Sequence, residues 1–295
     1  MKPLLAIDWG TSSLRGALLA DDGSILQETS AARGILTVPA GGFRQVFEDT
    51  FGPWFAQARL ALISGMAGSR QGWVEAPYAP CPAGLAELAS GLAWIEPGRI
   101  AIVPGLVCER DGTPDVMRGE ETQVFGALQL LGLRDAQLVL PGTHSKWVRA
   151  GAGRVESFAT FMTGEVYALL RRQSILARGM PGEEDGELHE DAFEQGLQQA
   201  RKSAGLLQSA FSARTLALFD RLPAQALPSY LSGLVIGDEL RAQGASLAPE
   251  IVVMANAALA RRYAIALKAW GVRSVRTLGS EATWQGLRMV AHALE

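Results

Sequence analysis

Hydrophobic and polar positions alternate along the chain with two different periods. Short apolar runs bounded by glycine predict buried strands, and longer stretches with an apolar residue every three or four positions predict helices. The predicted strands span residues 4–8, 14–20, 25–29, 60–65, 99–103, 137–140, 147–150, 155–160 and 251–255. The predicted helices span residues 43–54, 120–131, 164–176, 191–208, 230–242, 257–270 and 281–294. This mixture indicates an α/β fold class.

The first strands of the chain are predicted to be antiparallel. Asp21-Asp22-Gly23 stands between the second and third apolar runs and is a tight-turn signal. A dinucleotide-binding fold would instead pass from a strand through a glycine-rich turn into a helix.

Two segments about half the chain apart repeat one pattern. Residues 7–15 read Ile-Asp-Trp-Gly-Thr-Ser-Ser-Leu-Arg, and residues 140–147 read Leu-Pro-Gly-Thr-His-Ser-Lys-Trp. Each is a strand, a Gly-Thr-x-Ser turn, a basic residue and a second strand, followed by a glycine-containing turn and a third strand. We interpret this as a two-fold duplication. The predicted domains are residues 1–134 and 135–280, and we expect the helix at 281–295 to return to the first domain.

Composition narrows the class of partner. Hydrophobic residues make up 48% of the 295 residues and charged residues 19%, which is typical of a packed globular protein. The 27 Lys and Arg against 30 Asp and Glu leave a net charge of −3, so nucleic acid and anionic membranes are not expected partners. Cys81 and Cys108 form no metal or redox motif, and no run of 18 apolar residues or signal peptide occurs. We therefore expect a cytoplasmic protein with a small-molecule partner.

The two Gly-Thr-x-Ser turns have the chemistry of phosphate sites. A turn rich in glycine and hydroxyl side chains presents backbone N–H groups that can cradle a phosphate. Asp8 ends the strand before the first turn, where a carboxylate can hold hydrated Mg²⁺ against phosphates. Lys146, one of only four lysines, follows the second turn. A hairpin turn with a capping aspartate remains the alternative for either turn alone. The candidate phosphate-binding residues are Gly10, Thr11, Ser12, Ser13, Gly142, Thr143, His144, Ser145 and Lys146.

Residues 7–13 resemble the first phosphate motif of the sugar-kinase, actin and hexokinase superfamily. More narrowly, five stretches together resemble the 2-dehydro-3-deoxygalactonokinase family. They are residues 8–12 (Asp-Trp-Gly-Thr-Ser), 65–73 (Gly-Met-Ala-Gly-Ser-Arg-Gln-Gly-Trp), 118–123 (Arg-Gly-Glu-Glu-Thr-Gln), 140–147 and 161–165 (Phe-Met-Thr-Gly-Glu). The resemblance covers the chain from residue 4 to about residue 170, and the rest follows more loosely.

The resemblance implies a fold and an activity. It implies two similar domains of the actin/hexokinase (ribonuclease H-like) type with an interdomain cleft in which ATP and substrate meet. It also implies ATP and Mg²⁺ as cofactors and phosphorylation of the terminal 6-hydroxyl of 2-dehydro-3-deoxy-D-galactonate.

Related kinases place a catalytic carboxylate at the start of the helix that precedes the second phosphate strand. In this sequence that position falls at Glu120 and Glu121, of which we favour Glu120 as the base. The usual superfamily residue is aspartate, so the glutamate is a departure. Alternatively, both glutamates only stabilise the helix, because negative charge is favourable at its N-terminus.

The carboxylate of a sugar acid calls for a fork-shaped donor, which arginine supplies. Arg70 and Arg118 are the candidates, with Gly68 and Ser69 in the same loop as Arg70 and Trp73 as an apolar wall for the sugar. Adenosine is expected at Ala255 and Asn256, a strand–helix junction where the resembling families usually carry glycine.

Other functions are less well supported by motifs. The sequence contains no G-x-x-x-x-G-K-[ST] and no G-x-S-x-G, which disfavours a P-loop kinase and a serine hydrolase. A kinase for another keto-deoxy sugar acid, such as 2-dehydro-3-deoxygluconate, stays open, as does a nucleotide-binding regulator or actin-like assembly protein. The sequence also leaves open whether the chain forms a homo-oligomer.

Overall fold

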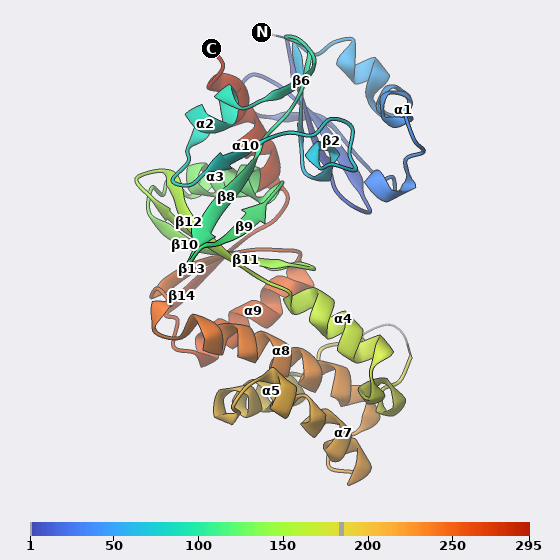
Figure 1. The fold of residues 1–295 in the computed structure, drawn as a ribbon, viewed down its shortest axis with the longest axis vertical. Helices are drawn as coiled ribbons and strands as arrows, with labels where there is room; N and C mark the ends of the chain where they lie inside the picture. Colours follow the sequence, from blue (N-terminus) through green and yellow to red (C-terminus); the bar gives the residue numbers. More distant parts are fainter. Residues whose placement is uncertain (1, 183–185) are drawn as a thin grey trace. The chain divides into compact units, whose positions relative to one another are not determined.

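The computed structural model of the chain describes residues 2–182 and 186–295 (Figure 1). Contacts group these residues into two compact units. Unit 1 contains the chain up to Ala136 together with Val148–Ala159 and Leu278–Glu295, and unit 2 contains Gln137–Trp147 and Thr160–Thr277. The predicted domains, residues 1–134 and 135–280, stay a prediction, because these units are defined by contacts alone.

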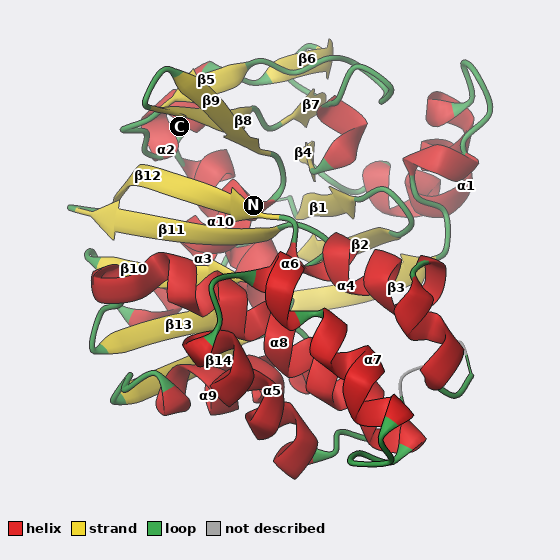
Figure 2. Cartoon of the chain, turned by 60° about the horizontal axis from the view of Figure 1, so that its bottom comes forward, coloured by secondary structure: helices red, strands yellow, loops and turns green. Residues whose placement is uncertain are grey.

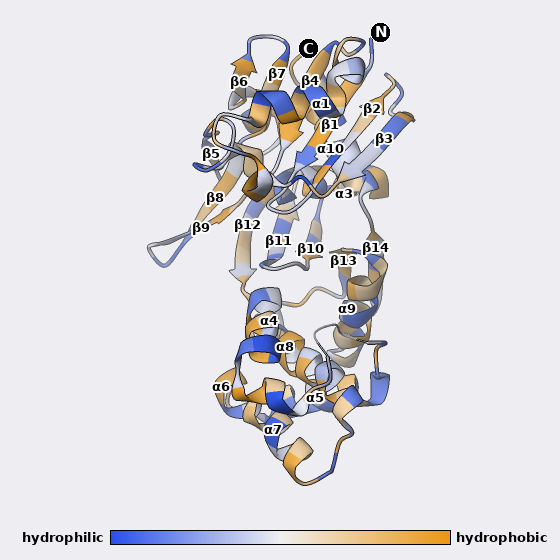
Figure 3. Cartoon of the chain, turned by 90° about the vertical axis from the view of Figure 1, so that its right-hand side faces the viewer, coloured by the Kyte–Doolittle hydropathy of each residue, from blue (hydrophilic) through white to orange (hydrophobic). Residues whose placement is uncertain are grey.

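In the described part of unit 1, six strands form a mixed sheet in the order β3-β2-β1-β4-β7-β6. Their bounds are β1 Leu4–Trp9, β2 Leu14–Leu19, β3 Ile25–Ala31, β4 Leu60–Ser64, β6 Ala93–Glu96 and β7 Ile100–Ile102. β1, β2 and β3 pair antiparallel, which confirms the prediction from the Asp22-Gly23 turn. β1, β4 and β7 run parallel, so their carboxyl ends lie on one edge of the sheet. Figure 3 shows hydrophobic colours on the buried β4 and hydrophilic colours on the edge strand β3.

A smaller sheet and helices complete unit 1. Within the described residues this sheet has the order β5-β8-β9, with β5 Tyr78–Pro80, β8 Gly105–Arg110 and β9 Thr113–Met117. The helices are α1 Phe43–Phe55, α2 Leu85–Ser90, α3 Glu120–Leu131 and α10 Glu281–His292, with 3₁₀ turns at Ile35–Thr37 and Met66–Gly68. α1 buries Phe43, Phe47 and Phe51, spaced four residues apart on one face. These rings pack with Trp9 of β1 in the core of the unit.

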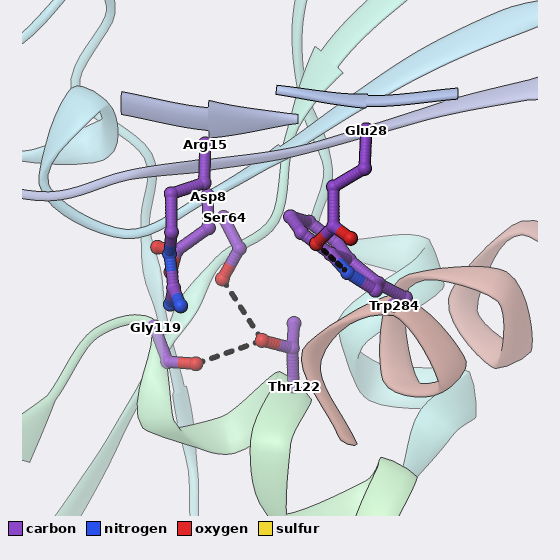
Figure 4. A network of polar contacts seen from close by, with 7 residues as sticks. All are labelled: Asp8, Arg15, Glu28, Ser64, Gly119, Thr122 and Trp284. Carbon is purple, nitrogen blue, oxygen red and sulfur yellow. Dashed lines mark hydrogen bonds and ion pairs between the residues drawn. The ribbon is translucent and has the colours of Figure 1, made fainter. Parts of the chain in front are cut away.

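The last helix, α10, packs directly on α3. A Cβ on Gly126 would lie 1.8 Å from the carbonyl oxygen of Ala282, and a Cβ on Gly286 would lie 1.8 Å from that of Thr122. The two helix backbones therefore touch, which only glycine permits. On another side of α10, Trp284 Nε1 donates to Glu28 Oε1 on β3 at 3.0 Å (Figure 4). Helix α10 thus contacts both α3 and the edge strand β3.

A second sheet repeats the strand order of the first. Among the described residues it has five strands in the order β12-β11-β10-β13-β14 (Figure 2). Their bounds are β10 Ala136–Leu140, β11 Ser145–Gly151, β12 Arg154–Phe161, β13 Glu250–Met254 and β14 Ser274–Leu278. This order corresponds to β3-β2-β1-β4-β7, and β10 pairs parallel with β13 as β1 does with β4. The predicted duplication and the α/β fold class are confirmed.

Helices form most of the rest of unit 2. They are α4 Thr163–Gln173, α5 Glu190–Lys202, α6 Leu206–Ser209, α7 Phe211–Leu218, α8 Leu227–Gln243 and α9 Ala257–Ala269, with 3₁₀ turns at Ile175–Gly179, Ala224–Ala226 and Gly244–Ser246. α5 and α8 also meet through glycines, since a Cβ on Gly196 would lie 2.2 Å from the carbonyl oxygen of Tyr230. No helix in residues 2–182 and 186–295 is long and apolar enough to cross a bilayer.

Two predicted helices are wrong in extent. The helix predicted at 191–208 is two helices, because α5 ends at Lys202 and Gly205 adopts φ 158° before α6. The helix predicted at 164–176 ends at Gln173, and the chain continues as a 3₁₀ turn capped by Ser174. The strands β5, β6, β8, β9 and β14 and the helices α2 and α7 were not predicted.

Candidate active site

Three segments of unit 1 converge at the carboxyl ends of its parallel strands. Asp8 on β1 is the register partner of Ser64 on β4, and Gly65 follows Ser64. A Cβ on Gly65 would lie 3.3 Å from Asp8 Oδ1, and a Cβ on Gly119 would lie 3.2 Å from the Cα of Gly65. Both glycines have positive φ, 95° and 106°, which other residues rarely adopt. Glycine at these two positions therefore allows Asp8 and the start of α3 to lie side by side.

Asp8 is paired with a cation from the neighbouring strand. It lies opposite Arg15 in the β1–β2 register, and Arg15 Nη2 donates to Asp8 Oδ2 (Figure 4). The Asp8 side chain is 15% exposed. Because this carboxylate is reachable from solvent, it can exchange its arginine for another cation. The sequence marked Arg15 only as the basic residue after the first turn.

The two glutamates at the start of α3 differ in burial. Glu120 Oε2 accepts from the backbone N–H of Arg118 at 3.0 Å, and Glu121 Oε2 accepts from that of Gly119 at 2.7 Å. Glu120 is half-buried, whereas Glu121 is fully buried and its Oε1 has no hydrogen-bond partner in the described part of the chain. Burial, and secondly the charge of Glu120, raise the pKa of Glu121 to about 8. At neutral pH most Glu121 carboxyls are therefore protonated.

Hydroxyl groups fix the start of α3 to the end of β4 (Figure 4). Thr122 Oγ1 donates to the carbonyl oxygen of Gly119 at 2.7 Å, and it lies 3.0 Å from Ser64 Oγ. A threonine hydroxyl has one proton to donate, so Ser64 is the donor of the second bond. Both side chains are fully buried, and this chain of bonds sets the position of the two glutamates relative to β4.

Arg118 is a buried cation with unused donors. The residue is 9% exposed, its Nη2 donates to the carbonyl oxygen of Ala76 at 2.8 Å, and its guanidinium lies 4.2 Å from the centre of the Tyr78 ring. Its Nε and Nη1 are buried and have no partner in the described ranges. A Cβ on Gly68 would lie 2.9 Å from Nη1, and the nearby hydroxyl of Ser69 is also buried without a partner. Unpaired buried donors are costly, so this group suits an anionic ligand.

Two other predicted substrate residues, Arg70 and Trp73, do not lie with Arg118. The Arg70 side chain is 87% exposed and forms an ion pair with Glu75 at 3.1 Å. Trp73 is half-buried, with its ring 6.1 Å from that of Trp9 and 5.5 Å from that of Phe47. Trp73 therefore belongs to the aromatic core beside α1, and Arg70 does not join Arg118.

The first Gly-Thr-x-Ser turn is fixed from one side and open on the other. The Gly10 N–H donates to the Ser13 carbonyl oxygen at 2.9 Å, and that of Ile35 donates to the Gly10 carbonyl oxygen at 3.0 Å. A Cβ on Gly34 would lie 2.2 Å from the Thr11 carbonyl oxygen. Thr11, Ser12 and Ser13 are exposed. Their hydroxyl and N–H groups are available to a ligand.

The second turn divides into an open and a closed half. Gly142, Thr143 and His144 are exposed, and His144 Nε2 lies 2.6 Å from Glu165 Oε2. Ser145 is fully buried, and Lys146 is buried with its Nζ donating to Thr160 Oγ1 at 2.8 Å. In this conformation the first three residues of the turn face solvent, and the serine and lysine face the interior of the unit.

Glu239, which the sequence analysis did not single out, lies behind this turn. It is buried on α8 and accepts hydrogen bonds from four side chains of the described residues. Oε1 accepts from Ser145 Oγ at 3.0 Å and Trp147 Nε1 at 2.6 Å, and Oε2 accepts from Thr163 Oγ1 and from Tyr263 Oη at 2.8 Å. Burial raises the pKa of Glu239, although these bonds act in the opposite direction. One carboxyl group thus connects β11, α4, α8 and α9.

Unit 2 contains a cavity of about 310 Å³ beside the open half of the second turn. Gly142 and Thr143 line it, and Val235, Ile236 and Leu259 contribute apolar surface. Asn256 Oδ1 accepts from the backbone N–H of Leu259 at 3.0 Å, so Asn256 caps α9, which brings Leu259 to the cavity. Cavities of a few hundred Å³ with apolar walls and few polar groups are typical small-molecule sites.

Comparison with known proteins identifies the family. A family model for 2-keto-3-deoxy-galactonokinase matches residues 8–290. The chain belongs to this family. A relative from Rhizobium meliloti (strain 1021), named probable 2-dehydro-3-deoxygalactonokinase, is 37% identical over 98% of this chain and 96% of its own. The 2-dehydro-3-deoxygalactonokinase of Escherichia coli (strain K12) is 33% identical over 98% of each chain. A crystal structure of a Sinorhizobium meliloti protein, also named for this activity, is 36% identical, covers 100% of this chain and 99% of its own, and superposes with a TM-score of 0.91.

Within the residues that the structure describes, the site shows no cage of side chains around a metal position. The described residues contain no cluster of three His, Cys, Asp or Glu side chains that could hold a metal ion. Asp8 is instead a lone carboxylate at the end of the strand that leads into the Gly10–Ser13 turn. That arrangement fits Mg²⁺ that keeps several waters and is held largely by phosphate oxygens.

Proposed function

We propose that this protein transfers the γ-phosphoryl group of ATP to the terminal hydroxyl of 2-dehydro-3-deoxy-D-galactonate, giving the 6-phosphate. Family membership and two relatives named for this activity support the proposal. Among the observations on the site, Arg118 carries it. A buried guanidinium with two unpartnered nitrogens suits a carboxylate, and Arg118 stands two residues before the helix that bears Glu120 and Glu121.

In this proposal the substrate carboxylate pairs with Arg118. Nε and Nη1 point in different directions around the guanidinium, and each shares one edge with Nη2. One carboxylate oxygen can therefore accept from Nη1 or Nε while the other accepts from the second N–H of Nη2. The Ser69 hydroxyl supplies a further donor. Because Gly68 lies against Nη1, the segment from Gly65 to Ala76 has to shift for the carboxylate to reach Arg118.

Glu120 is the proposed general base. As the terminal hydroxyl oxygen bonds to the γ-phosphorus, its proton passes to Glu120, and the bond from phosphorus to the β–γ bridging oxygen breaks to release ADP. Glu121 is less suited to this role, because burial keeps most of its carboxyl groups protonated at neutral pH. Its proposed part is to hold the N–H of Gly119, and so the start of α3, through Oε2.

The donor nucleotide is assigned to the two turns and the cavity of unit 2. Thr11, Ser12 and Ser13 in the first turn and Gly142 and Thr143 in the second present exposed donors for phosphate oxygens. Asp8 would hold Mg²⁺ through water, and the ion would neutralise phosphate charge. The apolar walls of the cavity suit the nucleoside.

A coupled assay for ADP release tests the proposed function. The purified protein is given Mg·ATP with 2-dehydro-3-deoxy-D-galactonate, with its C4 epimer 2-dehydro-3-deoxy-D-gluconate, or with no acid. We expect rapid ADP release with the first, much slower release with the epimer and almost none without acid.

Equal or faster turnover of the epimer would transfer the assignment to another sugar acid. ATP hydrolysis that no sugar acid stimulates would instead indicate a nucleotide-dependent regulator.

A further inference from the structure

The cavity in unit 2 is lined by a charged residue and a hydroxyl residue that have no role in the proposed reaction so far. Its lining includes Arg262 and Ser232 in addition to the turn and the apolar side chains. Arg262 is half-buried and Ser232 is buried on α8. No aspartate or glutamate is among the residues lining this cavity in the described part of the chain, so Arg262 gives it a positive charge.

Arg262 lies three residues after Leu259 on α9, so the two side chains share one face of the helix. Both line the cavity. The Arg262 guanidinium makes no hydrogen bond or ion pair with any residue of 2–182 or 186–295. A cation without a partner, next to an apolar wall in a cavity that lacks acidic groups, has the chemistry of a ligand contact.

The preceding residue offers a matched comparison. Arg261 is also on α9, but its side chain is 62% exposed and forms an ion pair with Glu190 on α5. Arg261 does not line the cavity. The two arginines are neighbours on one helix and have the same side chain. Arg262 faces the cavity, whereas Arg261 faces solvent and Glu190.

We propose that Arg262 is a nucleotide-binding residue whose guanidinium contacts the phosphate donor in this cavity. The inference rests on the proposed function, because it takes the cavity as the site of the donor nucleotide. A guanidinium can lie flat on a purine ring or donate to its ring nitrogens and to phosphate oxygens, and each contact is available only to the residue that lines the cavity.

Isothermal titration of the full-length protein with Mg·ADP tests the proposal without the sugar acid. We expect Arg262→Ala to weaken ADP binding by about tenfold or more, as for the loss of one charged hydrogen bond or stacking contact. Arg261→Ala is expected to bind ADP within about twofold of the unmodified protein. Melting temperatures show whether each variant is folded, and Arg262→Gln replaces Arg262→Ala if the latter is unstable.

Each outcome separates the inference from the function on which it rests. If the unmodified protein binds no ADP at millimolar concentration, the proposed donor is wrong and the inference falls with it. If the unmodified protein binds ADP and the folded Arg262 variant binds it equally well, only the inference is overturned. An equal loss in both variants also overturns it, because the effect would then reflect the charge of α9 and not a contact in the cavity.

Discussion

Replacing Glu121 by glutamine should change how the stability of the protein depends on pH. Glutamine has nearly the same shape and carries no charge at any pH. Glu121 is fully buried, and its pKa is raised from an ordinary 4.5 to about 8. Between these two values the folded protein holds a proton that the unfolded chain has lost, so a rise in pH favours unfolding. Below about pH 4.5 both states are protonated, and above about pH 8 both are ionised.

The magnitude follows from the width of that window. At about 1.4 kcal/mol per pH unit, moving the pKa from 4.5 to about 8 corresponds to roughly 5 kcal/mol. Relaxation around a buried charge reduces this, so we take about 5 kcal/mol as an upper limit. The free energy of unfolding of the unmodified protein should therefore fall, relative to that of Glu121→Gln, as pH rises from about 5 to about 8.5. A difference of several kcal/mol would be comparable with the whole stability of many domains.

Urea unfolding of both proteins at several pH values measures this difference. All other titrating groups are shared, so the change in the difference with pH reports Glu121 together with its coupling to Glu120. Glu120→Gln provides a comparison, because it removes the second cause of the raised pKa and should narrow the window without reversing its direction. A difference that stays constant from about pH 5 to about pH 8.5 would show that Glu121 is not held uncharged, and the argument against it as the base would fail.

Three further variants and one comparison variant test the proposed chemistry. Asp8→Asn should lower kcat by at least about a hundredfold with little change in melting temperature, because it removes the charge that would organise Mg²⁺, and near-normal kcat would remove Asp8 from the mechanism. Glu120→Gln should lower kcat by roughly 10²–10⁴-fold with nearly unchanged KM values in steady-state assays, and a wild-type rate would mean that another group is the base. Arg118→Lys should raise the KM for the sugar acid by tenfold or more but leave that for ATP nearly unchanged, since lysine cannot make a two-pronged contact. Arg70→Lys should raise the KM for the sugar acid much less, because Arg70 is exposed and paired with Glu75. A larger rise in Arg70→Lys than in Arg118→Lys would place the substrate carboxylate at Arg70.

Local signals made much of the fold predictable. The bounds predicted for α3 agree with the structure because two acidic residues mark its first turn and Gly132, in the left-handed conformation, ends it. The hairpin of β8 and β9 was missed because Pro114 inside β9 argues against a strand, and only pairing with β8 stabilises it there. The break after α5 was missed because apolar spacing continues past Gly205.

The candidate site residues could be predicted where they belong to a motif of residues close together in the sequence. The motif around Asp8 and the position of Glu120 and Glu121 follow from sequence, but which glutamate is buried does not. Adjacent residues on a helix point about 100° apart, and only the packing around α3 determines which one faces inward. Glu239 is far from Ser145 in sequence, so their hydrogen bond left no local pattern. The signal that could have identified Glu239 is an acidic pair, Asp238 and Glu239, directly after an apolar run in α8.

The contact between α10 and α3 has a consequence for synthesis of the protein. A ribosome completes α3 more than a hundred residues before it reaches Gly286 and Trp284. During that time the face of α3 that contains Gly126 has no covering helix, and β3 lacks the Trp284 partner of Glu28. The nascent chain therefore cannot give α3 its final environment until all of unit 2 has been translated. Premature release before residue 281 would leave a chain with every proposed catalytic residue but without α10, the helix that packs on α3.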